Sequence, residues 1–286
     1  MPNKVAVVTD STAYLPKEFL KQYNISVTPL SVVWGEQDCL DGVDILPEEF
    51  YNRLATSKVM PTTSQVTPAA MHSMFQSLLE QGYDVLGIFL STKISGTIQS
   101  ALQAREMLPN AADKIVIFDS LSTTMAMGWP VLMTARAAQA GESLAECQKV
   151  AENARQNSGV LFIVETLEFL RRGGRIGGAQ AFLGTALNIK PVLEMRDGQI
   201  AALEKIRTKQ KAIRYAVETV TERIRGKGPI RLAATHANCE GDASLLLEAA
   251  CVQLDPVETF CCPLSPVIGT HTGPGTIALN YMSGIP

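Results

Sequence analysis

The sequence predicts an α/β protein of two domains. Short β-branched runs alternate with helical patterns through the first half of the chain, which is typical of a mostly parallel sheet covered by helices on both faces. The second half carries a hairpin signal followed by helix–strand units, which favours an α+β domain. We therefore expect an N-terminal α/β domain over residues 1–158 and a C-terminal α+β domain over residues 159–286.

The first half alternates predicted strands and helices. Strands are expected at residues 5–9, 25–33, 84–90 and 114–118, and helices at 17–23, from 47, at 68–82, at 97–108 and from 143. Pro47 suits the first turn of a helix. Thr67 is a suitable N-cap, and Ser143 with Glu146 forms a capping box.

The second half begins with a predicted strand at residues 159–165 and a glycine-rich turn at Gly173 and Gly174. Strands at 188–195 and 199–205 are expected to form a hairpin around residues 196–198. A helix at 209–225, a strand at 230–235, a helix at 242–254 and a strand at 257–262 complete the predicted elements.

The composition limits the classes of partner. The hydrophobic fraction is 46% and the charged fraction is 19%, against roughly 25% in typical soluble domains. This balance indicates either a well-filled core or an apolar cavity. The formal net charge of −3, without a basic stripe, gives no electrostatic basis for binding nucleic acid.

The sequence also bears on location and cofactors. Its apolar runs are shorter than the roughly 18 residues that a membrane-spanning helix needs, and the first one is too short for a signal peptide. We expect a cytoplasmic protein, and in that compartment its six cysteines, which include no CxxC pair and lie mostly in apolar surroundings, should be reduced and buried. The three histidines do not cluster with the cysteines, so neither a metal site nor another cofactor is expected.

Four segments rich in Ser and Thr lie at predicted strand ends or helix starts, namely residues 9–12, 61–65, 90–97 and 119–124. Open α/β sheets bind ligands at such strand ends. Hydroxyl side chains at these positions also cap helices. The pattern alone leaves both interpretations open.

Among these segments, Ser95-Gly96-Thr97 gives the most specific indication of a ligand site. Gly96 would let the backbone approach a ligand, and Thr97 would cap the helix that begins there. Ser95 would then be free to face an anion. A nucleophilic serine is the rival interpretation, although the flanking residues lack the Gly-x-Ser-x-Gly elbow.

Three further segments combine tight backbone with cations or an imidazole. Residues 169–176 carry arginines around two glycines, without the Gly-Lys-Ser/Thr ending of a phosphate loop. Arg207 and Lys205 lie two residues apart near a strand end, so both would face the same way. Residues 266–275 hold three glycines around His271, which indicates a ligand loop rather than a core strand.

Together these motifs resemble the DegV family of bacterial fatty-acid-binding proteins, which includes FakB-type carriers. The resemblance covers essentially the whole chain. It rests on residues 8–12 (VTDST), 63–65 (TSQ), 90–101 (LSTKISGTIQSA), 119–120 (DS), 170–176 (LRRGGRI), 190–193 (KPVL), 197–198 (DG) and 268–275 (IGTHTGPG). One departure is Val66-Thr67-Pro68, where the family usually has Pro-Ser after Thr-Ser-Gln.

The resemblance implies a DegV-like fold of two domains with a fatty acid between them. The lipid carboxylate would be held by Thr63 and Ser95 from the first domain and by Arg175, Arg207 and His271 from the second. Of these five positions, Arg207 matches the family pattern least securely. A long-chain acid needs one polar anchor and a dry tunnel, and each buried methylene contributes roughly 0.8 kcal/mol. Candidate tunnel residues, for which an ordinary core role is as good an interpretation, are Ile94, Ile98, Met125, Met127, Phe182, Leu183 and Leu187.

The resemblance also implies a function and partners. The protein would be a carrier without catalysis of its own. It would present the acid to a separate ATP-dependent fatty acid kinase, which makes an acyl-phosphate for phospholipid synthesis. Transient contact with a membrane surface would accompany lipid exchange.

Two other classes of function remain open from the residues alone. One is a hydrolase or acyl transferase that uses Ser95 with His271. The other is a regulatory module that senses lipid and binds another protein. The first needs a base beside the serine, and the second needs an exposed apolar patch that changes with occupancy.

Overall fold

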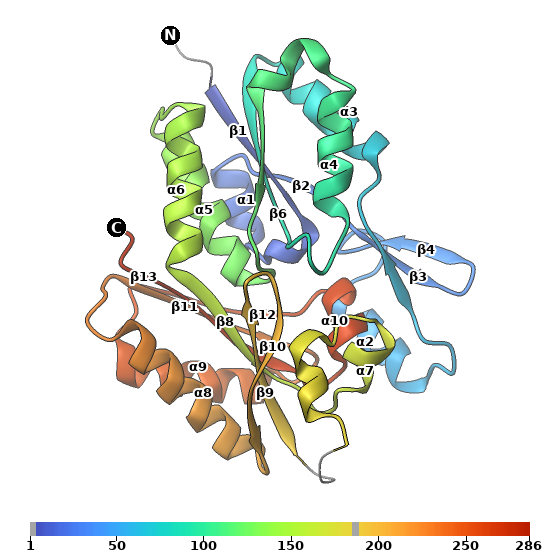
Figure 1. Ribbon diagram of the computed structural model, residues 1–286, viewed down its shortest axis with the longest axis vertical. Helices are drawn as coiled ribbons and strands as arrows, with labels where there is room; N and C mark the ends of the chain where they lie inside the picture. The colour runs from blue at the N-terminus through green and yellow to red at the C-terminus, as the bar shows by residue number, and fades with distance from the viewer. Residues whose placement is uncertain (1–3, 185–188) are drawn as a thin grey trace.

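The computed structural model describes residues 4–184 and 189–286, and its first half is built on a parallel sheet (Figure 1). Four strands lie in the order β2-β1-β6-β7 and are all parallel. They are β1 (Lys4–Asp10), β2 (Ser26–Thr28), β6 (Tyr83–Phe89) and β7 (Ile115–Asp119). The predicted mostly parallel sheet is therefore confirmed.

Helices cover both faces of this sheet. In Figure 1, α3 (Pro68–Glu80) and α4 (Thr97–Glu106) lie on one side, and α5 (Met125–Gln139) and α6 (Leu144–Gln156) lie on the other. The side-chain oxygen of Thr67 accepts a hydrogen bond from the N–H of Ala70, and that of Ser143 accepts one from Glu146. Both predicted N-caps are thus confirmed.

A small antiparallel sheet, in the order β4-β3-β5, corrects the prediction of one strand at residues 25–33. Its strands are β3 (Ser31–Trp34), β4 (Gln37–Leu40) and β5 (Thr62–Ser64). The predicted strand is split at Pro29 between β2 and β3, which belong to different sheets. Proline has no N–H to donate, so it interrupts a sheet ladder. The separate β3 pairs with β5 and fixes the position of Thr63 opposite Val32.

The second half forms a six-stranded mixed sheet in the order β10-β9-β8-β13-β11-β12. Its strands are β8 (Ser158–Ile163), β9 (Lys190–Arg196), β10 (Gln199–Ile206), β11 (Ile230–His236), β12 (Glu258–Pro263) and β13 (Ile277–Ser283). The β9–β10 hairpin is confirmed, with Asp197 and Gly198 at positive φ in its turn. The central strand β13 had no counterpart among the predicted elements.

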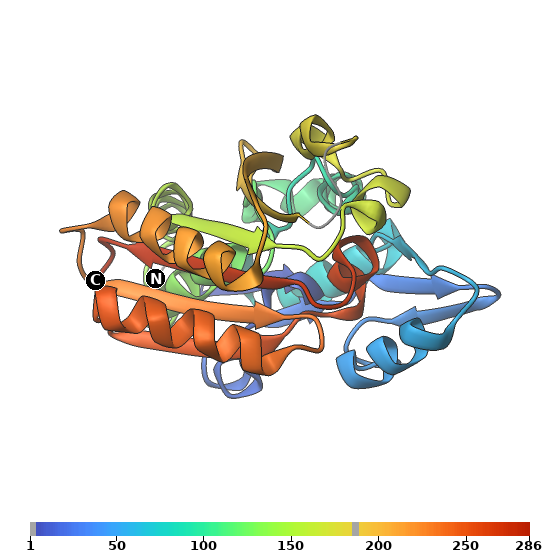
Figure 2. The same ribbon diagram turned by 90° about the horizontal axis from the view of Figure 1, so that it is seen from below.

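The two faces of this sheet serve different purposes. Leu161, Ile163 and Leu279 pack against α8 (Lys209–Ile224) and α9 (Glu240–Leu254), which lie along one face (Figure 2). The alternate residues Val160, Phe162 and Ala278 point to the other face, toward Ala126 of α5. Because successive side chains of a strand point to opposite faces, the second face of this sheet is turned toward the first half of the chain.

Shorter helices complete the chain, namely α1 (Lys17–Gln22), α2 (Pro47–Thr56), α7 (Glu168–Arg172) and α10 (Pro266–Thr272), with 3-10 turns η1 (Ser11–Ala13), η2 (Pro109–Lys114) and η3 (Gly177–Phe182).

The predicted ligand loop at 266–275 is wrong in its first part, because residues 266–272 are the helix α10. Pro266 occupies its first turn and Gly273, at φ 78°, ends it. His271 is therefore held on a helix.

The predicted domain boundary falls at the first residue of β8, and it remains a prediction. Strands of the two smaller sheets all precede it, and strands of the six-stranded sheet begin at it or follow it. Within the described residues, no helix has the length and apolar character needed to cross a membrane.

Candidate functional site

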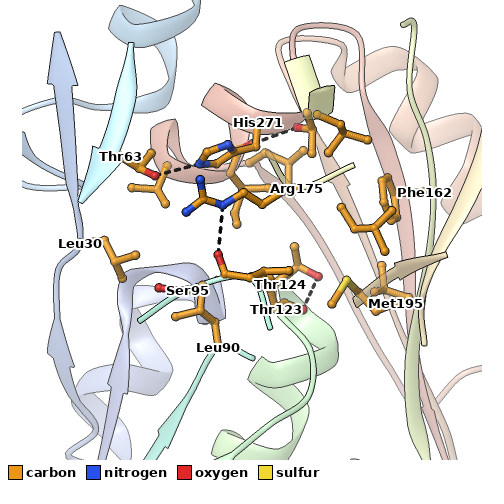
Figure 3. A pocket seen from close by; sticks show the side chains of 18 of the residues that line it. Leu30, Thr63, Leu90, Ser95, Thr123, Thr124, Phe162, Arg175, Met195 and His271 are labelled. Carbon is orange, nitrogen blue, oxygen red and sulfur yellow. Dashed lines mark hydrogen bonds between the residues drawn. The ribbon is translucent and has the colours of Figure 1, made fainter. Parts of the chain in front are cut away.

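A cavity of about 200 Å³ lies between the two halves of the chain (Figure 3). Its lining residues come from both halves of the chain. Those of the first half lie between positions 30 and 124, and those of the second half lie between positions 160 and 278. The walls are mostly apolar; they include Leu30, Leu90, Ile94, Val160, Phe162, Leu170, Met195, Ile200, Leu264, Val267, Ile268 and Ala278. The inward-facing residues of β8 thus form part of the cavity wall.

Thr63 and His271 form a polar pair in this cavity. The hydroxyl oxygen of Thr63 lies 2.8 Å from Nε2 of His271, which joins β5 to α10. Burial, and then the nearby Arg175 guanidinium, lower the pKa of His271 to about 4. The imidazole is therefore neutral at neutral pH and offers one donor nitrogen and one acceptor nitrogen.

Gly173 leaves the space that the imidazole occupies. A Cβ atom at this position would lie 2.1 Å from Nδ1 of His271. That nitrogen is buried and has no hydrogen-bond partner among the described residues. The glycine of the 170–176 segment thus has a steric role beside the imidazole, which the sequence pattern did not reveal.

Arg175 supplies the cation of the site. Its Nε donates to the carbonyl of Ile94 at 3.2 Å, and its Nη1 donates to the carbonyl of Gly173 at 2.6 Å. Among residues 4–184 and 189–286, no carboxylate lies within ion-pair distance of it. A half-buried guanidinium without an acidic partner makes this part of the cavity favourable for an anion.

Ser95 lines the cavity from the loop before α4, but the predicted capping is wrong. The N-cap residue of α4 is Gly96 rather than Thr97. Ser95 is engaged locally, because its hydroxyl oxygen lies 3.0 Å from that of Thr97 and accepts a bond from the Thr97 N–H at 3.3 Å. When the Thr97 hydroxyl donates to it, Ser95 keeps its own proton for a ligand.

The fifth predicted site residue, Arg207, does not join this group. It follows the last residue of β10 and is exposed, and it does not line the cavity. Among the candidate tunnel residues, Ile94 lines the cavity, whereas Ile98, Met125 and Met127 are buried in the core of the first half. Phe182 is partly buried beside Ile200, Leu183 is exposed, and Leu187 lies outside the described residues.

With this geometry established, comparison with known proteins identifies the family. The family model described as "Uncharacterised protein, DegV family" matches residues 4–284. The chain belongs to the DegV family. It is 37% identical to a DegV domain-containing protein of Listeria monocytogenes over 98% of this chain and 99% of the relative.

Solved DegV structures have the same fold. A protein from Thermus thermophilus, described as a fatty-acid-binding DegV family protein, matches with a TM-score of 0.92 and 34% identity over 98% of this chain and 99% of that chain. DegV of Bacillus subtilis, described as a fatty acid binding protein, matches with a TM-score of 0.89 and 35% identity over 99% and 100% of the chains. The DegV-like two-domain fold is thereby confirmed.

Two threonines of this DegV-family cavity were missed as site residues, although their hydroxyl-rich segment at 119–124 had been recognised. Thr123 lines the cavity, and its buried hydroxyl has no partner among the described residues. Thr124, at φ 57°, donates to Oδ1 of Asn280 at 2.5 Å. The contact ties the start of α5 to β13 across the two halves.

The hydroxyl segment at 9–12 has a structural role instead. Asp10 is fully buried at the end of β1 and accepts bonds from the N–H of Thr12, the hydroxyl of Thr12 and the N–H of Leu90. Its pKa is raised because burial outweighs these hydrogen bonds. The residue joins the carboxyl ends of β1 and β6, and it does not line the cavity.

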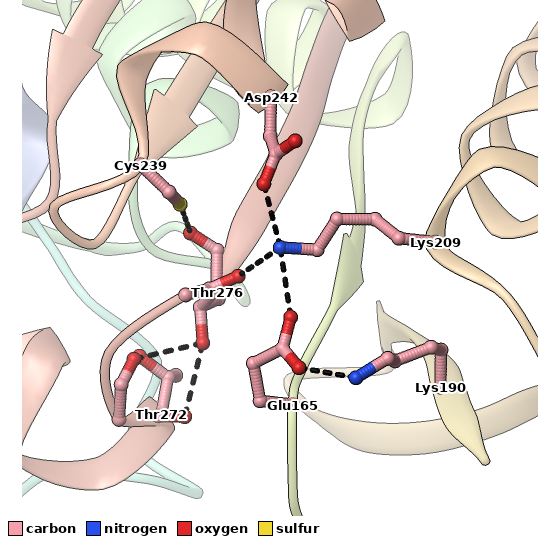
Figure 4. Close-up of polar contacts among 9 residues, drawn as sticks. Glu165, Lys190, Lys209, Cys239, Asp242, Thr272 and Thr276 are labelled. Atoms are coloured by element: carbon pink, nitrogen blue, oxygen red, sulfur yellow. Dashed lines mark hydrogen bonds and ion pairs between the residues drawn. The ribbon is translucent and has the colours of Figure 1, made fainter. Parts of the chain in front are cut away.

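A charged network supports the turn that follows α10 (Figure 4). Nζ of Lys209 lies 2.7 Å from carboxylate oxygens of both Glu165 and Asp242, and it donates to the carbonyl of Gly275 at 3.3 Å. The hydroxyl of Thr276 donates to the carbonyl of Thr272. These bonds connect α8 and the segment that follows β8 to the C-terminal end of the helix that carries His271.

Proposed function

We propose that this protein binds one long-chain fatty acid in the cavity between residues 1–158 and 159–286. Thr63, Ser95, Arg175 and His271 would hold the carboxylate, and the apolar walls would hold the acyl chain. The observation that carries the proposal is that an apolar cavity contains a neutral imidazole, His271, and a guanidinium, Arg175, that has no acidic partner among the described residues. A carboxylate needs such donors to offset the cost of burial.

The acyl chain would supply most of the binding free energy. Each methylene removed from water contributes roughly 0.8 kcal/mol. The β8 residues Val160 and Phe162 and the β10 residue Ile200 present apolar surface to the cavity. The DegV structures from Thermus thermophilus and Bacillus subtilis are described as fatty acid binding, which supports the same ligand class here.

We infer a carrier without catalysis of its own. In the rival hydrolase or acyl transferase, His271 would act as the base for Ser95. The imidazole of His271 is hydrogen-bonded to the Thr63 hydroxyl, and the Ser95 hydroxyl is hydrogen-bonded to the Thr97 hydroxyl. These contacts support a role for both hydroxyls as hydrogen-bond donors to a carboxylate.

The proposal includes a partner: this cytoplasmic carrier would present its bound acid to a separate fatty acid kinase for acyl-phosphate formation. An adjoining cavity of about 240 Å³ shares Thr63, Arg175 and His271 with the first and is bordered by the exposed residues Thr62 and Arg172. The carboxylate end would therefore be the part of the ligand nearest the surface. Transient membrane contact during lipid exchange belongs to the same proposal.

Calorimetric titration of delipidated protein with palmitate tests the binding function, and mass spectrometry of the extracted lipid identifies the natural ligand. We expect submicromolar binding of one palmitate per chain. Replacing Arg175 with Gln should weaken it about 10-fold or more, because a hydrogen bond to a charged group contributes about 1.5–3 kcal/mol. Arg207→Gln is the matched control and should bind normally. Absence of palmitate binding in the wild type, or equal losses in both variants, would contradict this assignment.

A further inference from the structure

One side chain separates the cavity between the two halves of the chain from a further cavity behind it. This further cavity, the rear cavity, has a volume of about 270 Å³, and among the described residues Met195 alone lines both. Ser122 and Gly159 line the rear cavity, while Thr123 and Val160, which follow them in the chain, line the first. The two spaces therefore adjoin at Met195.

Met195 lies at the end of the first cavity that is remote from the polar groups. Figure 3 shows the Met195 and Phe162 side chains on the opposite side of the cavity from Thr63 and His271. The adjoining cavity that shares Thr63, Arg175 and His271 with the first has no described lining residue in common with the rear cavity. A fatty acid whose carboxylate meets Arg175 would therefore point its methyl end toward Met195.

The backbone around Met195 is held in place, whereas its side chain can adapt. Met195 pairs with Ile200 across the β9–β10 hairpin and packs against the apolar cluster that includes Phe162. The hairpin turn is tied to the first half of the chain, because the Ser91 hydroxyl donates to the Gly198 carbonyl at 2.7 Å. Methionine is unbranched and fills irregular space in several rotamers. The end wall of the first cavity is thus an adaptable side chain on an anchored strand.

The rear cavity is polar and reaches the surface. Polar or charged side chains make up most of its lining, namely Ser120, Ser122, Arg155, Gln156, Ser158 and Asp197. Gln156 and Asp197 are exposed. A methylene that moves from water to an apolar wall tightens binding about fourfold. Methylenes that pass Met195 would lie beside polar groups and water, so they would add little affinity.

We propose that Met195 closes the methyl end of the fatty-acid site and sets the acyl-chain length beyond which added methylenes no longer tighten binding. This role rests on the proposed fatty-acid function and assigns the residue that selects chain length. A smaller side chain at this position lengthens the apolar part of the site, and a larger one shortens it. Because Met195 is remote from the carboxylate, its replacement changes the dependence on chain length and leaves carboxylate binding unchanged.

Competition titration of the delipidated full chain with laurate, myristate, palmitate, stearate and arachidate tests this role. In the wild type, affinity should rise about fourfold per methylene and level off before arachidate. Met195→Ala removes the thioether arm and should move this plateau by about two methylenes, so that the next longer acid binds about 10-fold more tightly than it binds the wild type. Met195→Trp should move the plateau to a shorter acid.

Three controls separate this role from carboxylate binding and from misfolding. Met107→Ala, at an exposed methionine outside both cavities, should keep the wild-type plateau. Laurate should bind the wild type and Met195→Ala within twofold, which shows that the variant is folded. Arg175→Gln should weaken binding of all five acids by the same factor and leave the position of the plateau unchanged.

The outcomes distinguish this role from the function on which it rests. The same plateau in wild type and Met195→Ala, or a wild-type affinity that still rises up to arachidate, would overturn the role of Met195 while the fatty-acid function stands. Failure of all five acids to bind the wild type would contradict the proposed function and this role with it.

Discussion

The hydroxyl of Thr63 and Nε2 of His271 lie 2.8 Å apart, although 208 positions separate the two residues in the chain. One belongs to β5 of the small antiparallel sheet, and the other lies on α10 after the last parallel strand. This contact brings a hydroxyl and an imidazole from opposite halves of the chain to the same cavity. The predictions below depend on this geometry.

Thr63→Val removes the hydroxyl and keeps the side-chain shape. We expect palmitate binding to weaken about 10-fold or more, because a donor to a buried charge contributes about 1.5–3 kcal/mol. Thr62→Val, on the exposed neighbouring position of β5, is the matched control. A titration in which both variants bind within twofold of the wild type would remove Thr63 from the site.

Gly173→Ala should displace His271 without straining the backbone, since φ at this position is −72°. The new Cβ would lie 2.1 Å from Nδ1, and a forced shift of this kind costs about 1–3 kcal/mol. We expect a lower free energy of unfolding in urea and weaker palmitate binding. Gly241→Ala, on α9, where a Cβ meets no atom within 4 Å, should be neutral or slightly stabilising. The same outcome for both alanine variants would refute the steric role.

His271 should make the folded protein sensitive to acid. Burial and then Arg175 lower its pKa from 6.5 to about 4. Between these values the unfolded chain binds more protons than the folded chain, so the free energy of unfolding should fall as pH falls. The loss should be on the order of 2–3 kcal/mol.

Comparing wild type with His271→Asn by urea unfolding between pH 7 and pH 4 isolates this contribution, because other titrating groups cancel in the difference. We expect the variant to lose less stability on acidification. Parallel curves for wild type and His271→Asn would contradict the prediction.

Ser95 should not behave as a nucleophile. Its recorded hydroxyl contacts are with Thr97, whereas an attacking serine needs an adjacent base. We expect a fluorophosphonate probe to leave Ser95 unlabelled and the bound fatty acid to be extracted intact, while Ser95→Ala binds palmitate more weakly. Labelling of Ser95, with an esterase activity that Ser95→Ala lacks, would instead establish the enzyme.

Local chemistry explains what the sequence by itself determined. The caps at Thr67 and Ser143 and the hairpin turn at Asp197 and Gly198 depend on hydrogen bonds and dihedral angles within a few residues. Alternating strands and helices likewise led to the parallel sheet, because each element has its own periodicity. Thr63, Ser95, Arg175 and His271 were chosen through a family resemblance, and all four line the cavity that the fold forms.

Tertiary structure decided the rest, because those outcomes depend on contacts between distant segments. Pairing with different sheets split residues 25–33 at Pro29, and β13 takes its central place through β8 and β11 on either side. Arg207 and Arg175 are both arginines beside turns, yet the first is exposed and the second reaches Ile94 inside the cavity. The bond between Thr63 and His271 forms only when both halves of the chain are folded against each other, so no local pattern encodes it.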